Sequence, residues 1–420
     1  DPFSLLDDAC RRRSATAVFC GGARLDYPGL RELALAAGRH LESLGARPGD
    51  RVAALFPNCH LYLAVYFATL LRRFVLVPLN VRLSPREMRA ILDHSGARLL
   101  IGDPGLAGPL LAAGAQAGEG WVAGRTGAAG AGAAQAAPPD AAHLYYTSGT
   151  TGRPKGVVLS RGNLAAHVDL TLQELGFGDR DAWLHAAPMF HLADAWAIWT
   201  ATAAAAAHVL LPRFEAPAAF DLIESNGVTV TNLVPTMLMA LLEEAEKRRR
   251  PLPSLRLLLS GGAPIAPGVA ARVGERLGCE YAQTYGLTET SPFLTFSLPG
   301  DRQRRLPPAE QMRLRARTGR PARGVEVRVV RPPGAERFAD VPADDTTVGE
   351  VVARGPTVTP GYWRDLEATR EAFKGGWFHT GDLATVDENG FINLVDRLKD
   401  VVITGGETVY STEVENVLYE

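Results

Sequence analysis

The stretch "DRVAALFPNCHLYLAVYFATLLRRFVLVPL", residues 50–79, places a longer apolar run between two shorter ones. Residues 50–56 and 73–79 have the length and the Val, Leu and Phe content of buried strands, whereas residues 61–71 are long enough for a helix. A strand, a helix and a second strand in this order predict a parallel βαβ unit. The stretch therefore favours a doubly wound α/β fold.

The following residues repeat the same order of elements. Ser84 can cap a helix, Pro85 suits its first position, Glu87 completes a capping box and Gly96 ends it, before a short strand at 97–101. Apolar runs that predict the strands of a second α/β region lie at 143–149, 182–188, 208–212, 228–235, 255–262 and 280–286.

Two segments depart from this pattern. Residues 103–141 are rich in Gly, Ala and Pro, so we expect a low-complexity, poorly structured connection between the two α/β regions. From about residue 320 to 396, short strands joined by turns predict a small β-barrel-like or antiparallel unit. The sequence thus predicts an N-terminal domain, residues 1–396, of two doubly wound subdomains and a β-rich subdomain.

Composition narrows the kinds of ligand. The chain has 420 residues and a formal net charge of −2, which gives no electrostatic reason to expect nucleic acid or an anionic membrane as a partner. Its four cysteines are scattered without metal-binding spacing, and no apolar run approaches the roughly 20 residues that cross a bilayer. We expect a cytoplasmic enzyme that binds small molecules, with no membrane span; the sequence is silent on oligomeric state.

The loop "TSGTTGRPKG", residues 147–156, combines glycines, hydroxyls and two cations, which suit a polyphosphate. It is not a Walker P-loop, because Lys155 follows Arg153-Pro154 and precedes Gly156. The loop resembles the signature of the AMP-forming adenylating superfamily, which includes acyl-CoA synthetases, luciferases and the adenylation domains of peptide synthetases. Acyl-CoA ligases are the nearest group.

Later motifs extend this resemblance over nearly the whole chain. "SGGAPIAP" (260–267) is similar to the loop that borders adenine, and "YAQTYGLTET" (281–290) to the segment that stacks on adenine and holds Mg²⁺. "WFHTGDLATVDENGFINLVDRLKD" (377–400) resembles the block whose Asp and Arg contact ribose. "ITGGETVYSTEVENVLYE" (403–420) resembles the start of a small α+β C-terminal domain, so we expect residues 397–420 to be a hinge and the beginning of a truncated domain whose catalytic lysine is absent.

The resemblance implies the roles of individual residues. It implies ATP and AMP contacts from Thr147, Ser148, Gly149, Thr150, Thr151, Gly152, Lys155, Gly261, Gly262, Ala263, Pro264, Thr284, Tyr285, Gly286, Thr288, Asp382 and Arg397. It implies catalytic roles for His191, Lys155, Thr288, Glu289 and Arg397, and Mg²⁺ contacts from Glu289 and Thr151. It implies a hinge and thiol channel formed by Lys399, Gly405, Gly406 and Glu407.

Three of these assignments have plainer alternatives. Tyr285 could fill a core, Glu289 could be a surface charge, and His191 could be a buried core histidine. The resemblance implies instead that Tyr285 stacks on adenine, Glu289 holds Mg²⁺, and His191 lies next to the reacting carboxylate.

The stretch "PMFHLADAW", residues 188–196, bears on the nature of the acid substrate. Amino-acid-activating relatives place an Asp directly after the aromatic position, whereas this chain has Leu192, so a substrate ammonium would lack a partner, although Asp194 is near. The expected acyl pocket consists of His191, Ala195, Trp196, Val234, Pro235, Met237, Gly262 and Leu287. It contains neither Arg nor Lys, which disfavours a diacid and favours a fatty or aromatic monocarboxylic acid.

The first hypothesis is therefore an AMP-forming carboxylic acid–CoA ligase that uses ATP, Mg²⁺ and coenzyme A. A second is an adenylating module that transfers the acyl group to the phosphopantetheine of an acyl-carrier protein. A third is a protein that binds nucleotide or acyl groups without turnover. Intact Lys155, Thr288, Glu289, Asp382 and Arg397 disfavour the third.

Overall fold

The structure is a computed structural model that describes residues 4–112, 115–118, 120–126, 138–147, 154–263, 265–300, 303–331, 338–400, 402–404 and 407–409. The chain folds into two compact units. Unit 1 comprises Asp1–Thr231 and Thr359–Leu366, and unit 2 comprises Asn232–Val358 and Glu367–Glu420. The predicted boundary between residues 396 and 397 stays a prediction, because most of the last twenty residues lie outside the described ones.

The βαβ unit predicted from residues 50–79 is confirmed. Strand β3 (Arg51–Leu55), helix α3 (His60–Leu71) and strand β4 (Val75–Pro78) follow one another, and β3 and β4 pair in parallel with Arg51 opposite Val75. They belong to a sheet of unit 1 with the strand order β19-β9-β8-β4-β3-β5-β7-β6. The other strands are β5 (Leu99–Gly102), β6 (Gln116–Ala117), β7 (Val122–Arg125), β8 (Ala141–Thr147), β9 (Lys155–Ser160) and β19 (Gly361–Tyr362).

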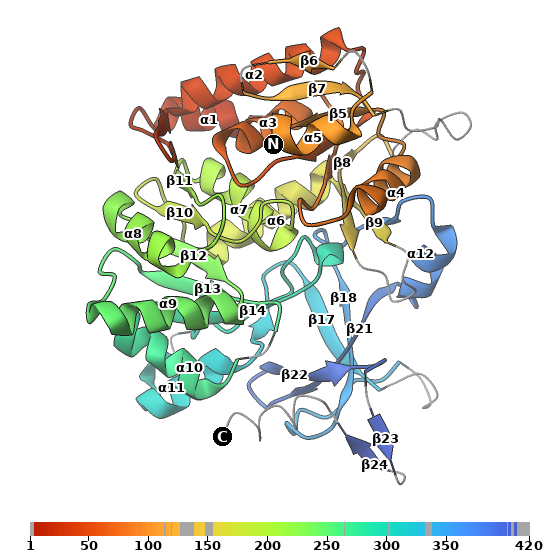
Figure 1. Ribbon diagram of the computed structural model, residues 1–420. Helices are drawn as coiled ribbons and strands as arrows, with labels where there is room; N and C mark the ends of the chain where they lie inside the picture. Colours follow the sequence, from red (N-terminus) through yellow and green to blue (C-terminus); the bar gives the residue numbers. More distant parts are fainter. Residues whose placement is uncertain are drawn as a thin grey trace. The chain divides into compact units, whose positions relative to one another are not determined.

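A second group of strands in unit 1 follows the order β2-β1-β11-β10-β12 within a larger sheet. Its strands are β1 (Val18–Cys20), β2 (Ala23–Leu25), β10 (Ala182–His185), β11 (Ala207–Leu210) and β12 (Val230–Leu233). The remaining helices of unit 1, seen in Figure 1 from red to green, are α1 (Leu5–Arg12), α2 (Tyr27–Ser43), α4 (Pro85–Ser95), α5 (Pro104–Ala107), η1 (Gly108–Leu110), α6 (Arg161–Leu175), α7 (Leu192–Ala203) and α8 (Ala216–Asn226). The parallel pairs β1–β11, β10–β11 and β10–β12 confirm the doubly wound prediction.

Helix α3 lies between the two sheets, since it contacts β1 of one sheet and β3 and β4 of the other. All nine residues from 62 to 70 are buried. A helix that is apolar on every side is stable only when it is covered on every side. The predominantly apolar composition of residues 61–71 therefore explains why α3 is covered by sheets on two sides.

Residues 103–141 differ from the expected unstructured connection. Helices α5 and η1 and strands β6 and β7 form between residues 104 and 125, and β7 pairs antiparallel with β5. The small residues permit this packing. A Cβ added to Gly124 would lie 3.0 Å from the Ala115 Cα, so there is no room for a larger side chain at this position. The composition was thus a sign of close packing as well as of turns; residues 127–137 lie outside the described residues.

Unit 2 contains two groups of strands. The strands β13 (Leu257–Ser260) and β14 (Glu280–Tyr285) are parallel, and β15 (Thr295–Phe296) and β16 (Arg320–Pro321) follow antiparallel. Helices and turns of this unit are α9 (Pro235–Arg248), α10 (Pro267–Arg272), η2 (Val273–Leu277), η3 (Thr288–Thr290), η4 (Gln303–Arg305), α11 (Pro308–Ala316) and α12 (Leu366–Ala372).

The predicted β-rich subdomain is an antiparallel sheet in which β17, β18, β21 and β20 follow one another and β22 pairs with β21 (Figure 1). The bounds are β17 (Glu326–Val330), β18 (Gly349–Arg354), β20 (Phe373–Lys374), β21 (Trp377–Val386) and β22 (Ile392–Arg397). A separate hairpin is formed by β23 (Val402–Thr404) and β24 (Glu407–Val409). The antiparallel prediction for this region is confirmed.

The capping box predicted for α4 is present. The Ser84 Oγ accepts from the Glu87 backbone N–H at 3.3 Å, and the Glu87 carboxylate accepts from the Ser84 N–H at 2.8 Å. Gly96 ends the helix with a φ of 69°. Both predicted ends of α4 are confirmed.

We expect Ser84→Ala to lower the free energy of unfolding by about 1 kcal/mol, because it removes the acceptor for a helix N-terminal donor. Ser84→Gly is the matched control and should cost only a few tenths of a kcal/mol, since glycine leaves the end open to water. Urea denaturation measures both. A loss of only a few tenths of a kcal/mol for Ser84→Ala as well would show that the cap contributes little.

Candidate active site

The adenine- and ribose-binding residues implied by the resemblance come together within unit 2. The Tyr285 hydroxyl donates to Asp382 Oδ2 at 2.7 Å, although the two residues are 97 positions apart in the chain. Arg397 faces Asp382 across the β21–β22 pair, with Nε 3.3 Å from Oδ1. Tyr285 ends β14, so the site begins at the carboxyl edge of the parallel pair β13–β14, where α/β sheets commonly bind ligands.

Burial tunes both groups of this contact. Removal from water raises the pKa of Tyr285 well above its usual value, and the nearby Asp382 charge adds to the effect, so the phenol stays a donor. Burial also raises the pKa of Asp382, while the Tyr285 hydrogen bond and Arg397 partly oppose the rise. Tyr285 therefore does more than fill a core, because its hydroxyl orients the Asp382 carboxylate.

The loop around Asp382 is held by Glu350, a residue that the sequence patterns did not single out. Glu350 is buried on β18, and its carboxylate accepts from the Gly381 N–H at 3.3 Å and lies 2.8 Å from His379 Nδ1. Thr380 Oγ1 donates to the Val351 carbonyl at 2.8 Å. A charged residue in an otherwise apolar strand was the available signal for this support.

The loop after β13 is joined to β14 by two contacts. Gln283 Nε2 donates to the Ala263 carbonyl at 2.8 Å, and Thr284 Oγ1 donates to the Ser260 carbonyl at 3.1 Å. A Cβ on Gly261 would lie 3.0 Å from the Thr284 carbonyl oxygen, so this glycine is needed for close packing on β14 rather than for approach to a ring. Gly262 has a φ of 88° and is required by the turn itself.

Glu289 lies in the turn η3, directly after the strand that ends at Tyr285. Its side chain is buried, so the surface-charge alternative is wrong. Thr288 is the neighbouring residue and is half-buried. A carboxylate and a hydroxyl are oxygen donors of the type that Mg²⁺ accepts, and they fit an ion whose other ligands come from phosphates and water. No group of three His, Cys, Asp or Glu side chains that could hold a metal occurs among the described residues.

In unit 1, the glycine-rich loop connects two paired strands. Thr147 ends β8 and Lys155 begins β9, and these two residues face each other in the antiparallel register. The Lys155 ammonium lies 5.2 Å from the centre of the Tyr362 ring, a favourable cation–π distance. Residues 148–153, which include the predicted Thr151 contact to Mg²⁺, lie outside the described residues, as do Pro264, Gly405 and Gly406.

His191 is the residue immediately before α7. Its side chain is exposed, so the alternative of a core histidine is wrong. Surrounding protein nevertheless lowers the pKa of His191 through desolvation, and the charge of Arg82 lowers it further, which favours the neutral ring. The ring centre lies 4.7 Å from that of Phe190.

The residues expected to line an acyl pocket divide into two groups. Ala195 and Trp196 have no accessible surface, and Trp196 packs against Trp183 with ring centres 4.8 Å apart. Val234, Pro235, Met237, Gly262 and Leu287 of unit 2 are half-buried or exposed.

Of the residues expected to form the hinge and thiol channel, Lys399 is exposed, and the side chain of Glu407 lies outside the described part of the chain. The roles of all these residues stay predictions.

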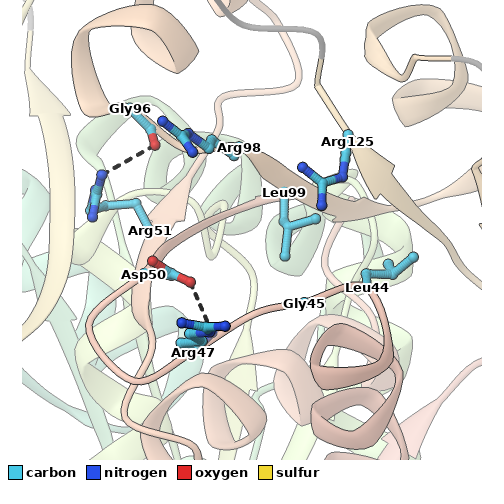
Figure 2. A pocket seen from close by; sticks show the side chains of 9 residues that line it. All are labelled: Leu44, Gly45, Arg47, Asp50, Arg51, Gly96, Arg98, Leu99 and Arg125. Carbon is cyan, nitrogen blue, oxygen red and sulfur yellow. Dashed lines mark hydrogen bonds between the residues drawn. The ribbon is translucent and has the colours of Figure 1, made fainter. Parts of the chain in front are cut away.

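A hollow of about 410 Å³ in unit 1 is lined by Leu44, Gly45, Arg47, Asp50, Arg51, Gly96, Arg98, Leu99 and Arg125. Figure 2 shows these side chains. It lies where α2 and α4 end and where β3 and β5 begin. Helix C termini attract cations, and Arg51 Nε donates to the Ser95 carbonyl at 3.0 Å. Because β8 runs parallel to β4 and ends at Thr147, the hollow lies at the opposite end of these strands from the glycine-rich loop. We therefore assign Arg51 to the C-terminal end of α4.

The chain is similar to known coenzyme A ligases in sequence and in fold. Feruloyl-CoA synthase from Amycolatopsis sp. is 39% identical over 416 residues, which cover 96% of this chain and 80% of the relative. A long-chain-fatty-acid–CoA ligase from Thermus thermophilus is 38% identical and covers 90% and 72%, respectively. The structure of O-succinylbenzoate coenzyme A synthetase from Bacillus subtilis, in complex with ATP and magnesium ion, superimposes with a TM-score of 0.82 at 28% identity and covers 99% of this chain and 84% of that one.

The chain belongs to the AMP-binding enzyme family, whose model matches residues 6–363. Within this family it is an AMP-forming carboxylic acid–CoA ligase, an acid–thiol ligase that uses ATP, Mg²⁺ and coenzyme A. No helix in the described part of the chain is both long enough and apolar enough to cross a membrane.

We expect Asp382→Ala to weaken ATP binding by about 1.5–3 kcal/mol, or roughly 10- to 100-fold, because ribose loses a charged acceptor. Tyr285→Phe should cost less, since it leaves the carboxylate in place but unoriented. Asp340→Ala removes an exposed carboxylate of the same unit and is the matched control. Calorimetry with ATP measures all three; equal affinity of Asp382→Ala and the control would contradict the assignment.

The raised pKa of Asp382 predicts a pH dependence of nucleoside binding. The carboxylate form accepts the ribose hydroxyls, so affinity should fall as the pH is lowered toward the raised pKa, at a higher pH than for an ordinary aspartate. Adenosine is the suitable probe, because it lacks a phosphate that titrates near neutral pH. The fall should be absent in Asp382→Asn, which does not titrate. An identical pH profile for both proteins would exclude Asp382 as the group responsible.

Proposed function

We propose that unit 2 binds the adenosine of ATP through Tyr285, Asp382 and Arg397, and that the acid is a fatty or aromatic monocarboxylic acid. The observation that carries the nucleotide part is the Tyr285–Asp382 hydrogen bond, which joins two separate sequence motifs in one contact. Tyr285 offers an aromatic ring for adenine, and Asp382 offers an acceptor for ribose.

The chemistry needs few proton transfers from the protein. A carboxylic acid is already ionised at neutral pH, and its oxygen attacks the α-phosphate of ATP while pyrophosphate leaves. Positioning and stabilisation of charge are then the main tasks. In this proposal Lys155, Thr147 and the loop between them hold the phosphates, and Thr288 contacts the α-phosphate. Glu289 holds Mg²⁺, which would neutralise charge on the phosphates when bound.

The second half-reaction transfers the acyl group from the adenylate to the thiol of coenzyme A, and AMP leaves. We assign the hinge to Lys399 and the wall of the thiol channel to Gly405, Gly406 and Glu407 by resemblance alone. The names of the relatives described above refer to coenzyme A, so they favour this acceptor over a carrier protein. Four free cysteines agree with a cytoplasmic location.

The structure of α7 bears on the nature of the acid. Asp194, the carboxylate nearest in sequence to His191 that could hold a substrate ammonium, has no accessible surface. Its two oxygens lie within hydrogen-bond distance of Trp183 Nε1 and His185 Nδ1. Leu192 is buried as well. An ammonium group placed beside His191 would therefore find no carboxylate from this helix, and its desolvation would be costly.

A matched pair of acids tests this part of the proposal. 3-Phenylpropanoate and phenylalanine share one skeleton and differ by the ammonium group. We expect the full-length protein to release pyrophosphate with apolar acids, such as 3-phenylpropanoate, ferulate or a long-chain fatty acid, and to reject phenylalanine, because the charge is left unpaired. Turnover of phenylalanine without turnover of the apolar acids would overturn the proposed substrate class.

A further inference from the structure

A continuous chain of polar side chains runs through the core of unit 1. His185 Nδ1 lies 2.6 Å from Asp194 Oδ2, and His185 Nε2 lies 3.0 Å from His208 Nδ1. His208 Nε2 lies 3.0 Å from Thr202 Oγ1. At the other end, Trp183 Nε1 donates to Asp194 Oδ1 at 3.3 Å. All five side chains have no accessible surface, so water cannot replace any of these contacts.

The chemistry of the groups gives this chain a direction. A carboxylate only accepts hydrogen bonds, so in the arrangement with Asp194 as a carboxylate and His185 as a neutral ring, His185 donates from Nδ1 and accepts at Nε2. His208 must then donate from Nδ1 and accept at Nε2, which makes the Thr202 hydroxyl the donor. Burial lowers the pKa of His208 well below its usual value, as a neutral ring requires. Every polar atom named in the chain is thereby paired.

The chain connects both ends of one helix to the sheet beneath it. Asp194 belongs to the first turn of α7 and Thr202 to its last turn, whereas His185 ends β10 and His208 lies on β11. The first turn is also where His191 is attached, because the His191 carbonyl accepts from the N–H groups of Asp194 at 3.2 Å and Ala195 at 3.1 Å. A shift of Asp194 would therefore move His191 as well.

We infer that Asp194 and its partners form a positioning system for His191, which holds the start of α7 at a fixed place on β10 and β11. This inference rests on the proposed function, in which the His191 ring lies beside the carboxylate of the acid. Asp194 is a positioning residue and does not touch the substrate. Burying polar side chains costs free energy unless every group is hydrogen-bonded. In this network, the hydrogen bonds also fix the position of a helix that carries a functional residue.

The test compares four variants of the full-length protein with the most active apolar monocarboxylic acid. Asp194→Asn keeps the size of the side chain but replaces one acceptor oxygen by a donor, and Thr202→Val breaks the far end of the chain. Thr200→Val is the matched control, because Thr200 is a buried threonine of the same helix whose hydroxyl pairs with Thr171 at 2.6 Å, outside the chain. His191→Ala is the reference for loss of the ring itself.

We expect Asp194→Asn to lower kcat/KM for the acid by up to roughly 10²-fold, since a small misplacement of a reacting group can have that effect. Thr202→Val should give a smaller loss in the same direction. The KM for ATP should stay within about twofold in both, and Thr200→Val should behave as the parent protein does. Equal losses for Thr200→Val and Thr202→Val, or a matching rise in the KM for ATP, would overturn the inference.

A double-mutant cycle separates an effect of Asp194 through His191 from a general structural effect. If Asp194 acts through His191, Asp194→Asn should have little further effect on the acid kcat/KM in the His191→Ala background. Additive losses would indicate a general structural role and overturn the inference. If His191→Ala alone changes nothing, the proposed role of His191 fails instead. If Asp194→Asn does not fold, the same cycle with Thr202→Val gives the decision.

Discussion

Unit 1 depends on one requirement, which is that helix α3 must be covered on all sides. Its residues 62–70 are all buried, and it contacts strands of two different sheets. Burying an apolar side chain contributes about 1.5–3 kcal/mol, so a helix without a polar face strongly favours a layer on each side. The two sheets are consequences of this requirement. Strand β8 ends at Thr147, and helix α7, which packs on the strands, begins directly after His191.

The nucleotide site proposed for unit 2 depends on a similar requirement at a smaller scale. In the proposed role, Asp382 binds ribose as a carboxylate, yet Asp382 is buried, and burial favours its protonated form. The Tyr285 hydroxyl and the Arg397 guanidinium oppose that tendency and hold the charged form in one orientation. Glu350 holds the backbone at Gly381 from behind. Desolvation of the Asp382 carboxylate costs free energy, but the carboxylate is already oriented before a ligand binds.

The sequence predicted the elements of the fold because their signals are local. Apolar runs gave the strands, and Ser84, Glu87 and Gly96 gave both ends of α4. Strand β7 was missed because its Ala and Gly content looks like a linker, and its pairing with β5 depends on tight contact with Ala115. In the site, motif resemblance indicated Asp382 and Tyr285, whereas the support from Glu350 and the pairing of His185 with Asp194 depend on which distant segments meet. No single stretch of sequence contains that information.

The buried chain from Asp194 to Thr202 also has a consequence for how the strands find their places. In the parallel pair β10–β11, Trp183 stands opposite His208 and His185 opposite Leu210. A slip of one residue would turn His208 to the other face of the sheet, because side chains alternate along a strand. His185 Nε2 and the Thr202 hydroxyl would then each lose their His208 partner, at a cost of about 1–3 kcal/mol for each unsatisfied group. Apolar side chains tolerate many arrangements, whereas this chain is satisfied in one register, so it selects against misaligned forms of unit 1.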